Sequence, residues 1–447
     1  MNIKNILAGA MVAGLTASAT AQTTEITITG ATAFRQATMQ AIYDAYDSVG
    51  DLGTGFNVCH DFTGNNLSQL IASNKAVFSG TFPGITGTTV IRTSFNGSAE
   101  GLNAIAGNNN PTFLTAAALG TPGAVIKGST TTPTETLRPK FSFSDVYQSS
   151  TPVDNMVLNP SGSSKVGIVT FCMIANEGAP ADLTNVTNQQ ARALWANGLQ
   201  KLSLFTGDPN DTDYVFATGR NDGSGTRAAY LTEWTYGVAN LVNQYIATST
   251  GTAGNSTITK ITAVPANGLG TGNTLTSGAS NASTLWGNTA VGNGGYSSSS
   301  ALRTVMGYTS ANVTVYDGST QDALIENANI LLLTWLSSAD SLQAAAAGGK
   351  ILSYNGVSVT PITASGSYLS SGFSEADFKK IATGAYSAWS YQHLYYHGSL
   401  STNENTWYTN MKSTWIPAGL QTTSNGVRLS DVTVSRPDDG FPIVAPL

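Results

Sequence analysis

A glycine-rich turn with one arginine lies near the middle of the chain, where residues 219–226 read GRNDGSGT. The turn follows the apolar run 214–217 and precedes apolar residues at helical spacing, which predicts a strand, a turn and a helix. The first turn of a helix presents free backbone N–H groups at the positive end of its dipole. A guanidinium matches the oxygens of a tetrahedral anion two at a time. The stretch therefore predicts an oxyanion site in which Asp222 holds the guanidinium of Arg220.

Ser224 and Thr226 add hydroxyl donors to this predicted site. The alternative is a plain surface loop, because Asp-Gly-Ser-Gly is also ordinary turn chemistry. The turn is not a nucleotide-binding P-loop, because no Gly-Lys-Ser/Thr follows at the required spacing. It is not a nucleophile elbow either, because Ser224 lacks the Gly-x-Ser-x-Gly frame.

Three other predicted strands end in groups that suit an anion. Strand 25–29 ends at a small-residue turn, strand 89–94 precedes a helix for which Ser98 is a candidate N-cap, and strand 141–145 ends in the carboxylate of Asp145. Ligands of open α/β sheets bind outside the carboxyl ends of the strands. The four strand ends are therefore expected to share one cleft.

The elements that would position this cleft indicate an exported α/β protein of 447 residues in two lobes. Residues 1–21 combine a basic start, a short apolar run and a small-residue end, which predicts a secretory signal peptide and a periplasmic or secreted protein. No later apolar run reaches the roughly 18 residues of a membrane span. The net charge of −6 argues against nucleic acid as a partner.

Several short motifs resemble the periplasmic phosphate-binding proteins of ABC uptake systems. The most specific one is Arg-x-Asp-Gly-Ser-Gly-Thr at 220–226, and the weaker ones are TGATAF at 29–34, GSAEG at 97–101 and FSD at 143–145. The resemblance implies a two-lobed periplasmic-binding-protein fold, with mixed sheets flanked by helices, a hinge and an interlobe cleft. It implies lobe 1 at 22–166 and 389–447, lobe 2 at 167–388, and chain crossings near 167–173 and 389–396.

The resemblance also implies the ligand and the partners of the chain. Inorganic phosphate would be captured without catalysis, cofactor or metal, and an ABC permease would be the transport partner. The implied ligand-binding residues are Ala33, Phe34, Ser98, Asp145, Arg220, Asp222, Ser224, Gly225 and Thr226. Asp145 would accept a proton that the ligand brings, so that hydrogen phosphate binds and fully ionised sulfate is rejected.

This chain departs from the family pattern at two positions near the cleft. Arg35 stands where the family favours proline, and it could add a cation at the mouth of the cleft or face solvent. Glu100 stands where the family favours glycine, and it would oppose an anion if it pointed inward. Segments 50–88, 108–139 and 248–300 look like insertions, and the last of them is interpreted as extended loops.

The remaining candidates point away from catalysis. His393 and His397 have the spacing of zinc ligands on a helix, but the alternating pattern there favours a strand. Cys59 and Cys172 could pair in an oxidising compartment or remain separate. No grouping of His, Ser and Asp supports a hydrolase. The alternative function is therefore a secreted surface or matrix protein that retains the fold in a structural or adhesive role.

Overall fold

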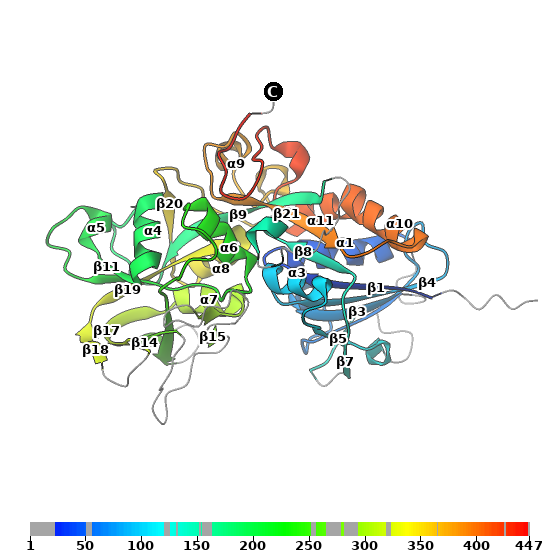
Figure 1. Ribbon diagram of the computed structural model, residues 1–447, viewed down its shortest axis with the longest axis horizontal. Coiled ribbons are helices and arrows are strands. Elements are labelled where there is room, and N and C mark those ends of the chain that lie inside the picture. The colour runs from blue at the N-terminus through cyan, green and yellow to red at the C-terminus, as the bar shows by residue number, and fades with distance from the viewer. Residues whose placement is uncertain are drawn as a thin grey trace, which may run out of the picture.

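The computed structural model shows the predicted mixed α/β architecture, arranged in two halves (Figure 1). The structure describes residues 23–50, 56–119, 126–130, 133–151, 153, 163–251, 256–264, 279–280, 294–318, 323–363, 365–423 and 426–445. The predicted signal peptide, residues 1–21, lies outside the described residues.

A mixed sheet with 13 described strands runs through both halves. Its strands in the first half are β1 (Thr23–Gly30), β2 (Asn57–His60), β3 (Lys75–Gly80), β4 (Thr88–Phe95), β6 (Ile126–Gly128) and β8 (Phe141–Ser144). Its strands in the second half are β10 (Asn185–Val186), β11 (Leu199–Lys201), β12 (Tyr214–Ala217), β19 (Ile330–Ser337) and β20 (Lys350–Tyr354). Two central strands, β9 (Lys165–Ala175) and β21 (Trp389–Tyr396), join these two sets.

The two central strands connect the halves through their pairing. β9 pairs with β21 along Lys165–Thr170 and with β19 along Phe171–Ala175, so one strand belongs to both halves. β21 in turn pairs with β8 of the first half. Both strands are almost entirely buried, as the continuous apolar run in β9 predicts for a strand covered on two faces. The chain crossings expected near residues 167 and 389 fall at or near the first residues of these strands.

Helices cover the sheet in each half (Figure 1). Those of the first half are α1 (Arg35–Asp47), α2 (Leu67–Ala72), α3 (Ser98–Ala106), α10 (Thr402–Asn410) and α11 (Ile416–Thr423). Those of the second half, with α9 near the centre, are α4 (Asn188–Asn197), α5 (Ser203–Thr206), α6 (Gly225–Glu233), α7 (Ser299–Met306), α8 (Ser338–Ala346) and α9 (Glu375–Ala382). Short helical turns are η1 (Ala116–Leu119), η2 (Gln148–Ser150), η3 (Tyr368–Ser370), η4 (Met411–Trp415) and η5 (Leu429–Asp431).

Three smaller sheets include strands from the segments at 108–139 and 248–300 that were interpreted as insertions. A four-stranded sheet joins β13 (Tyr245–Thr250), β14 (Thr257–Ala263), β17 (Thr309–Tyr316) and β18 (Ala323–Ala328). Two-stranded sheets pair β5 (Thr112–Leu114) with β7 (Thr134–Thr136), and β15 (Ala279–Ser280) with β16 (Gly295–Tyr296). The described residues of segment 248–300 therefore include strands and the start of α7, which corrects the expectation of extended loops for that part of the segment.

The C-terminal segment lies across the middle of the molecule and contacts both halves (Figure 1). Arg436 donates to the Glu233 carboxylate at 3.1 Å, at the end of α6 in the second half. Asp439 accepts hydrogen bonds of 2.7 Å from the N–H of Tyr147 and the hydroxyl of Ser150 in the first half. Both charged side chains are buried. The segment therefore ties the halves together on one side of the crossing strands.

Other sequence predictions can be checked in the described residues. Cys59 and Cys172 are both buried and are not joined by a disulfide. His393 and its neighbours form the predicted strand β21, and no group of three or more metal-ligating side chains occurs in the described part of the chain. Within the same residues, no helix has the length and apolar character that a membrane crossing requires.

Candidate functional site

The four strand ends that the sequence singled out face one another where the two halves meet. β1 pairs in parallel with β4 and with β8, so the carboxyl ends of these three strands lie at one edge of the sheet. β12 pairs in parallel with β19 in the other half. Gly30 at the end of β1 has φ +113°, and a Cβ there would lie 2.0 Å from the Phe143 carbonyl oxygen. Only glycine permits this close approach.

Ser98 occupies the first turn of α3 and is fully buried. The N-cap is Gly97, at φ +122°, and not Ser98 as predicted, because the chain turns at that glycine before the helix begins. The Ser98 hydroxyl is therefore free of the capping role and instead accepts a hydrogen bond of 3.0 Å from the N–H of Asp145. This bond links the ends of β4 and β8.

Asp145 is a buried carboxyl group at this junction, with 2% of its surface exposed. Its Oδ2 accepts a long hydrogen bond of 3.5 Å from the Thr226 hydroxyl, which belongs to the other half. Its Oδ1 is buried without a hydrogen-bond partner. Burial raises the pKa of Asp145 to about 7, although the positive charge of Arg220 and hydrogen bonds from Ser98 and Thr226 oppose the shift. Asp145 can therefore hold or release a proton near neutral pH.

Arg220 brings a buried guanidinium to the same junction. Its Nε donates to the Tyr296 carbonyl at 3.0 Å and its Nη2 to the Ser297 carbonyl at 2.9 Å. Its Nη1 donates to the Ser299 hydroxyl at 2.7 Å and, at 3.4 Å, to the hydroxyl of Thr32 in the first half. Burial lowers the pKa of Arg220 to about 10, so the group remains charged at neutral pH. Arg220 therefore spans the junction as a fixed cation.

The predicted pairing of Asp222 with Arg220 is wrong. Asp222 is buried, and neither of its carboxylate oxygens has a hydrogen-bond partner. The negative charge of Asp222 instead acts on two other groups. Burial raises the pKa of Glu100, and the charge of Asp222 raises it further. Burial lowers the pKa of Arg227, and the charge of Asp222 opposes that lowering. The carbonyls and hydroxyl at 296–299 hold the Arg220 guanidinium in place of Asp222, and these groups lie about 76 residues further along the chain.

The remaining predicted residues of the turn lie at the start of α6. The Ser224 hydroxyl caps the helix by accepting from the N–H of Arg227 at 3.4 Å. Gly225 packs directly against Ser98, because a Cβ on Gly225 would lie 2.1 Å from the Ser98 hydroxyl oxygen. Thr226 contacts Asp145 as described. This turn therefore closes against the first half.

Ala33 and Phe34 lie at the start of α1, next to Thr32. Phe34 is the N-cap residue and makes no side-chain capping bond, and both residues are buried. Their neighbour Thr32 contacts Arg220, so the uncapped end of α1 lies beside the guanidinium. The structure thus gathers Ser98, Asp145, Arg220, Gly225 and Thr226, with Ala33 and Phe34 adjacent.

The described conformation is closed at this point. The N–H of Glu100 donates to the Gly223 carbonyl across the junction at 3.3 Å, and a Cβ on Gly97 would lie 2.6 Å from that same oxygen. Glycines therefore allow the two backbones to touch. An anion could enter between Ser98 and Gly225 only after the halves part.

Thr32 and Ser299 are site residues that the sequence analysis missed. Thr32 belongs to a motif that was recognised, but only its neighbours received a role. Ser299 lies in the region interpreted as loops, although Ser298 followed by apolar residues 301, 302, 305 and 306 is a sequence pattern of a capped helix. Ser298 is indeed the N-cap of α7.

Comparisons with known proteins place these observations in context. No protein-family model matches the chain. No curated protein matches it either. Solved structures that resemble it include a protein from Clostridium perfringens, solved with bound phosphate and assigned as a phosphate ABC transporter substrate-binding protein (11% identity, TM-score 0.41, 91% of this chain and 99% of that chain).

Two further structures come from the same class of proteins. An ABC-type phosphate transport receptor from Vibrio cholerae has 9% identity and a TM-score of 0.40, over 88% of this chain and 96% of that chain. PstS from Borrelia burgdorferi has 10% identity and a TM-score of 0.35, over 89% of this chain and 96% of that chain. These are proteins of the class that the sequence motifs resemble. With TM-scores below 0.5, the similarity carries no inference about the ligand of this chain.

Proposed function

We propose that this protein is an exported solute-binding protein that captures inorganic phosphate between its two halves. The observation that carries the proposal is Asp145, a buried carboxyl that receives one hydroxyl from the opposite half and has one oxygen without a partner. A buried polar atom without a partner is costly, and a ligand that donates a hydrogen bond would remove the cost. Hydrogen phosphate carries such a donor.

The charges around Asp145 suit a protonated tetrahedral anion. Arg220 supplies a guanidinium that burial has stripped of water, and the starts of α1, α3 and α6 supply N–H groups and positive dipole ends. The proton of hydrogen phosphate would lie between ligand and Asp145. Sulfate carries no proton at neutral pH, so its oxygens would face the carboxylate and be repelled.

Capture would proceed by opening and closing of the two halves. The halves share β9 and β21, which can bend as a hinge while the strand ends part. The permease of an ABC uptake system is the proposed recipient of the phosphate, and the proposed compartment is the periplasm or the exterior. The proposed lobes are residues 22–166 with 389–447, and residues 167–388.

Titration calorimetry with phosphate and with sulfate at pH 7 tests this proposal. The wild-type protein should bind phosphate and give no heat with sulfate. Arg220→Ala should lose phosphate binding, whereas Arg192→Ala on the exposed face of α4 should keep it, because it removes the same charge away from the site. Ser98→Ala serves as a milder second variant that keeps Arg220 and its four contacts, and it should weaken phosphate binding.

The replacement of the carboxyl tests the selectivity. Asp145→Asn keeps the shape of the side chain but removes the negative charge, so sulfate should then bind. If this variant still excludes sulfate while binding phosphate, Asp145 does not select the ligand.

A structural role without a ligand is the second candidate function. The direct contact between Ser98 and Gly225, together with the C-terminal segment that ties the halves, favours a protein that stays closed. A secreted surface or matrix protein would need this rigidity. Absence of any phosphate-dependent heat in the wild-type protein would support this role.

A further inference from the structure

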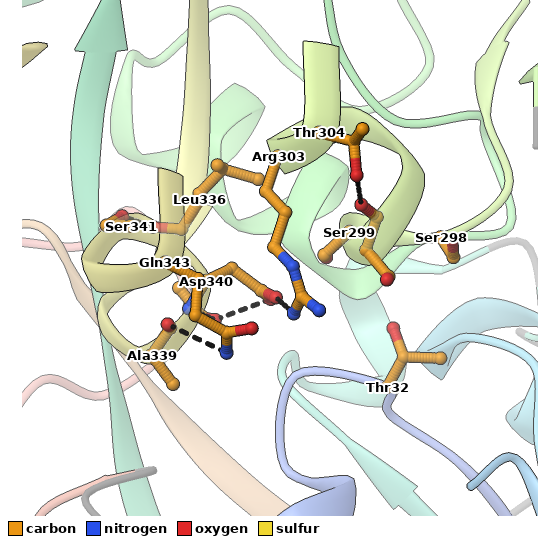
Figure 2. Close-up of polar contacts among 12 residues, drawn as sticks. Thr32, Ser298, Ser299, Arg303, Thr304, Leu336, Ala339, Asp340, Ser341 and Gln343 are labelled. Carbon is orange, nitrogen blue, oxygen red and sulfur yellow. Dashed lines mark hydrogen bonds and ion pairs between the residues drawn. The ribbon is translucent and has the colours of Figure 1, made fainter. Parts of the chain in front are cut away.

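A small polar cavity lies between the two halves, next to Arg220 and away from Asp145. Its walls come from Thr32, Ala33, Arg35 and Gln36 in the first half and from residues 298–300, 339 and 340 in the second. Figure 2 shows Thr32 opposite the start of α7, and Arg303 reaching Asp340. The free volume is about 10 Å³, enough for about one water molecule in the closed conformation.

Three guanidinium groups converge around this cavity. Arg303 makes an ion pair of 2.7 Å with Asp340. Burial lowers the pKa of Arg35, and the positive charge of Arg303 lowers it further. Burial lowers the pKa of Arg220, and the positive charge of Arg35 lowers it further. The cations therefore repel one another. Such mutual repulsion indicates a place where an added anion would be stabilised.

The carboxylates nearby compensate these cations only in part. The Asp340 carboxylate forms the ion pair with Arg303. Its negative charge also raises the pKa of both Arg35 and Arg220. Of these three arginines, Asp61 raises the pKa of Arg35, and Asp145 raises the pKa of Arg220. Burial raises the pKa of Asp61, and it raises the pKa of Asp145 to about 7. Among the described residues, Asp340 is therefore the carboxylate that acts on all three arginines.

Two further features of the cavity favour an anion. The Nε of Arg35 is buried without a hydrogen-bond partner, while its Nη1 contacts Asn74. The cavity also lies at the starts of α1, α7 and α8, where the helix dipoles are positive, and α1 has no side-chain cap. Hydroxyl groups of Thr32, Ser299 and Ser300 line it as additional donors.

We infer that this cavity is a second anion subsite, and that the ligand of the cleft carries two linked phosphoryl groups, as in a diphosphate. The inference rests on the proposed function, because the first phosphoryl group would occupy the site at Asp145. Arg220 connects the two subsites, since it acts on Asp145 and its Nη1 contacts Thr32 and Ser299 at the cavity. A single phosphate would leave the positive charge of the second subsite compensated only in part, by Asp340.

Titration calorimetry with inorganic diphosphate and with phosphate, without divalent cations, tests this inference. We expect diphosphate to bind the wild-type protein at least tenfold more tightly than phosphate. Arg35→Gln should remove most of this advantage and change the affinity for phosphate much less. Ser300→Ala is a smaller change at the same cavity and should reduce the advantage in the same direction, whereas Arg192→Gln on α4 should not.

The outcomes separate this inference from the proposed function. If phosphate binds and diphosphate binds no more tightly, the second subsite is refuted and the phosphate site stands. If diphosphate binds alone and Arg35→Gln abolishes its binding, the second subsite stands and phosphate is not the ligand. If neither anion binds to the folded wild-type protein, both are refuted. An advantage that survives Arg35→Gln and Ser300→Ala also overturns the second subsite.

Discussion

The replacement Asp145→Asn should change how the stability of the ligand-free protein depends on pH. Burial raises the pKa of Asp145 from 3.8 to about 7. The folded chain therefore holds this proton between pH 4 and 7, where the unfolded chain has released it, so the free energy of unfolding falls as the pH rises through this window. At about 1.4 kcal/mol per tenfold change, the loss attributable to Asp145 is on the order of 4 kcal/mol.

Asparagine has no carboxyl proton to lose, so the free energy of unfolding of the variant should not show this part of the fall between pH 4 and 7. We expect urea unfolding to show Asp145→Asn and wild type to differ little near pH 4, and the variant to be the more stable by a few kcal/mol near pH 8. Asp439 provides a matched control, because burial also raises its pKa to about 7 while it lies in the C-terminal segment. Asp439→Asn should flatten the same window without altering phosphate binding at the cleft.

An unchanged dependence of the free energy of unfolding on pH would refute this reasoning. If Asp145→Asn declines in stability between pH 4 and 7 as steeply as the wild-type protein, Asp145 is not a protonated buried acid. The proposed proton sharing with hydrogen phosphate would then lose its basis.

Two further substitutions test closure and its restraint. Gly225→Ala should lower the free energy of unfolding of the ligand-free protein by about 1–3 kcal/mol, because in the closed conformation the new methyl would lie 2.1 Å from the Ser98 hydroxyl oxygen and overpack the contact between the halves. Gly223→Ala is the matched change, and urea unfolding should show a smaller loss of stability because its methyl meets a flexible side chain. Arg436→Ala should lower the free energy of unfolding by about 3 kcal/mol, because it leaves the largely buried Glu233 carboxylate without its cation. Equal stability of this variant in urea would show that the C-terminal segment does not fasten the halves.

Much of the architecture could be predicted because it leaves local patterns in the sequence. The apolar run 214–217 and the segments 25–29 and 89–94 predicted strands that the structure contains, and the small-residue turns marked where strands end. These features depend on neighbours within a few residues, such as the alternation of side chains or a glycine at positive φ. For the same reason Ser98, Asp145 and Thr226 were found as candidates from their places at strand and helix ends.

The partners of Arg220 could not be predicted in the same way. Its guanidinium is held by groups near residue 297, and no local spacing connects a turn with a segment so far along the chain. Asp222 was assigned as its partner because it lies two residues away, but neither of its carboxylate oxygens has a hydrogen-bond partner, and the guanidinium instead donates to groups at 296–299. The cavity beside Arg35 was missed for a similar reason, since its walls come from three distant helix starts.

A crystal structure of the protein grown with phosphate tests the central claim most directly. The account predicts one tetrahedral anion within hydrogen-bond distance of Ser98, Asp145 and Arg220, with Ser98 and Gly225 moved apart to admit it. Phosphate bound elsewhere, or a cleft in which Ser98 and Gly225 remain in contact at saturating phosphate, would contradict it.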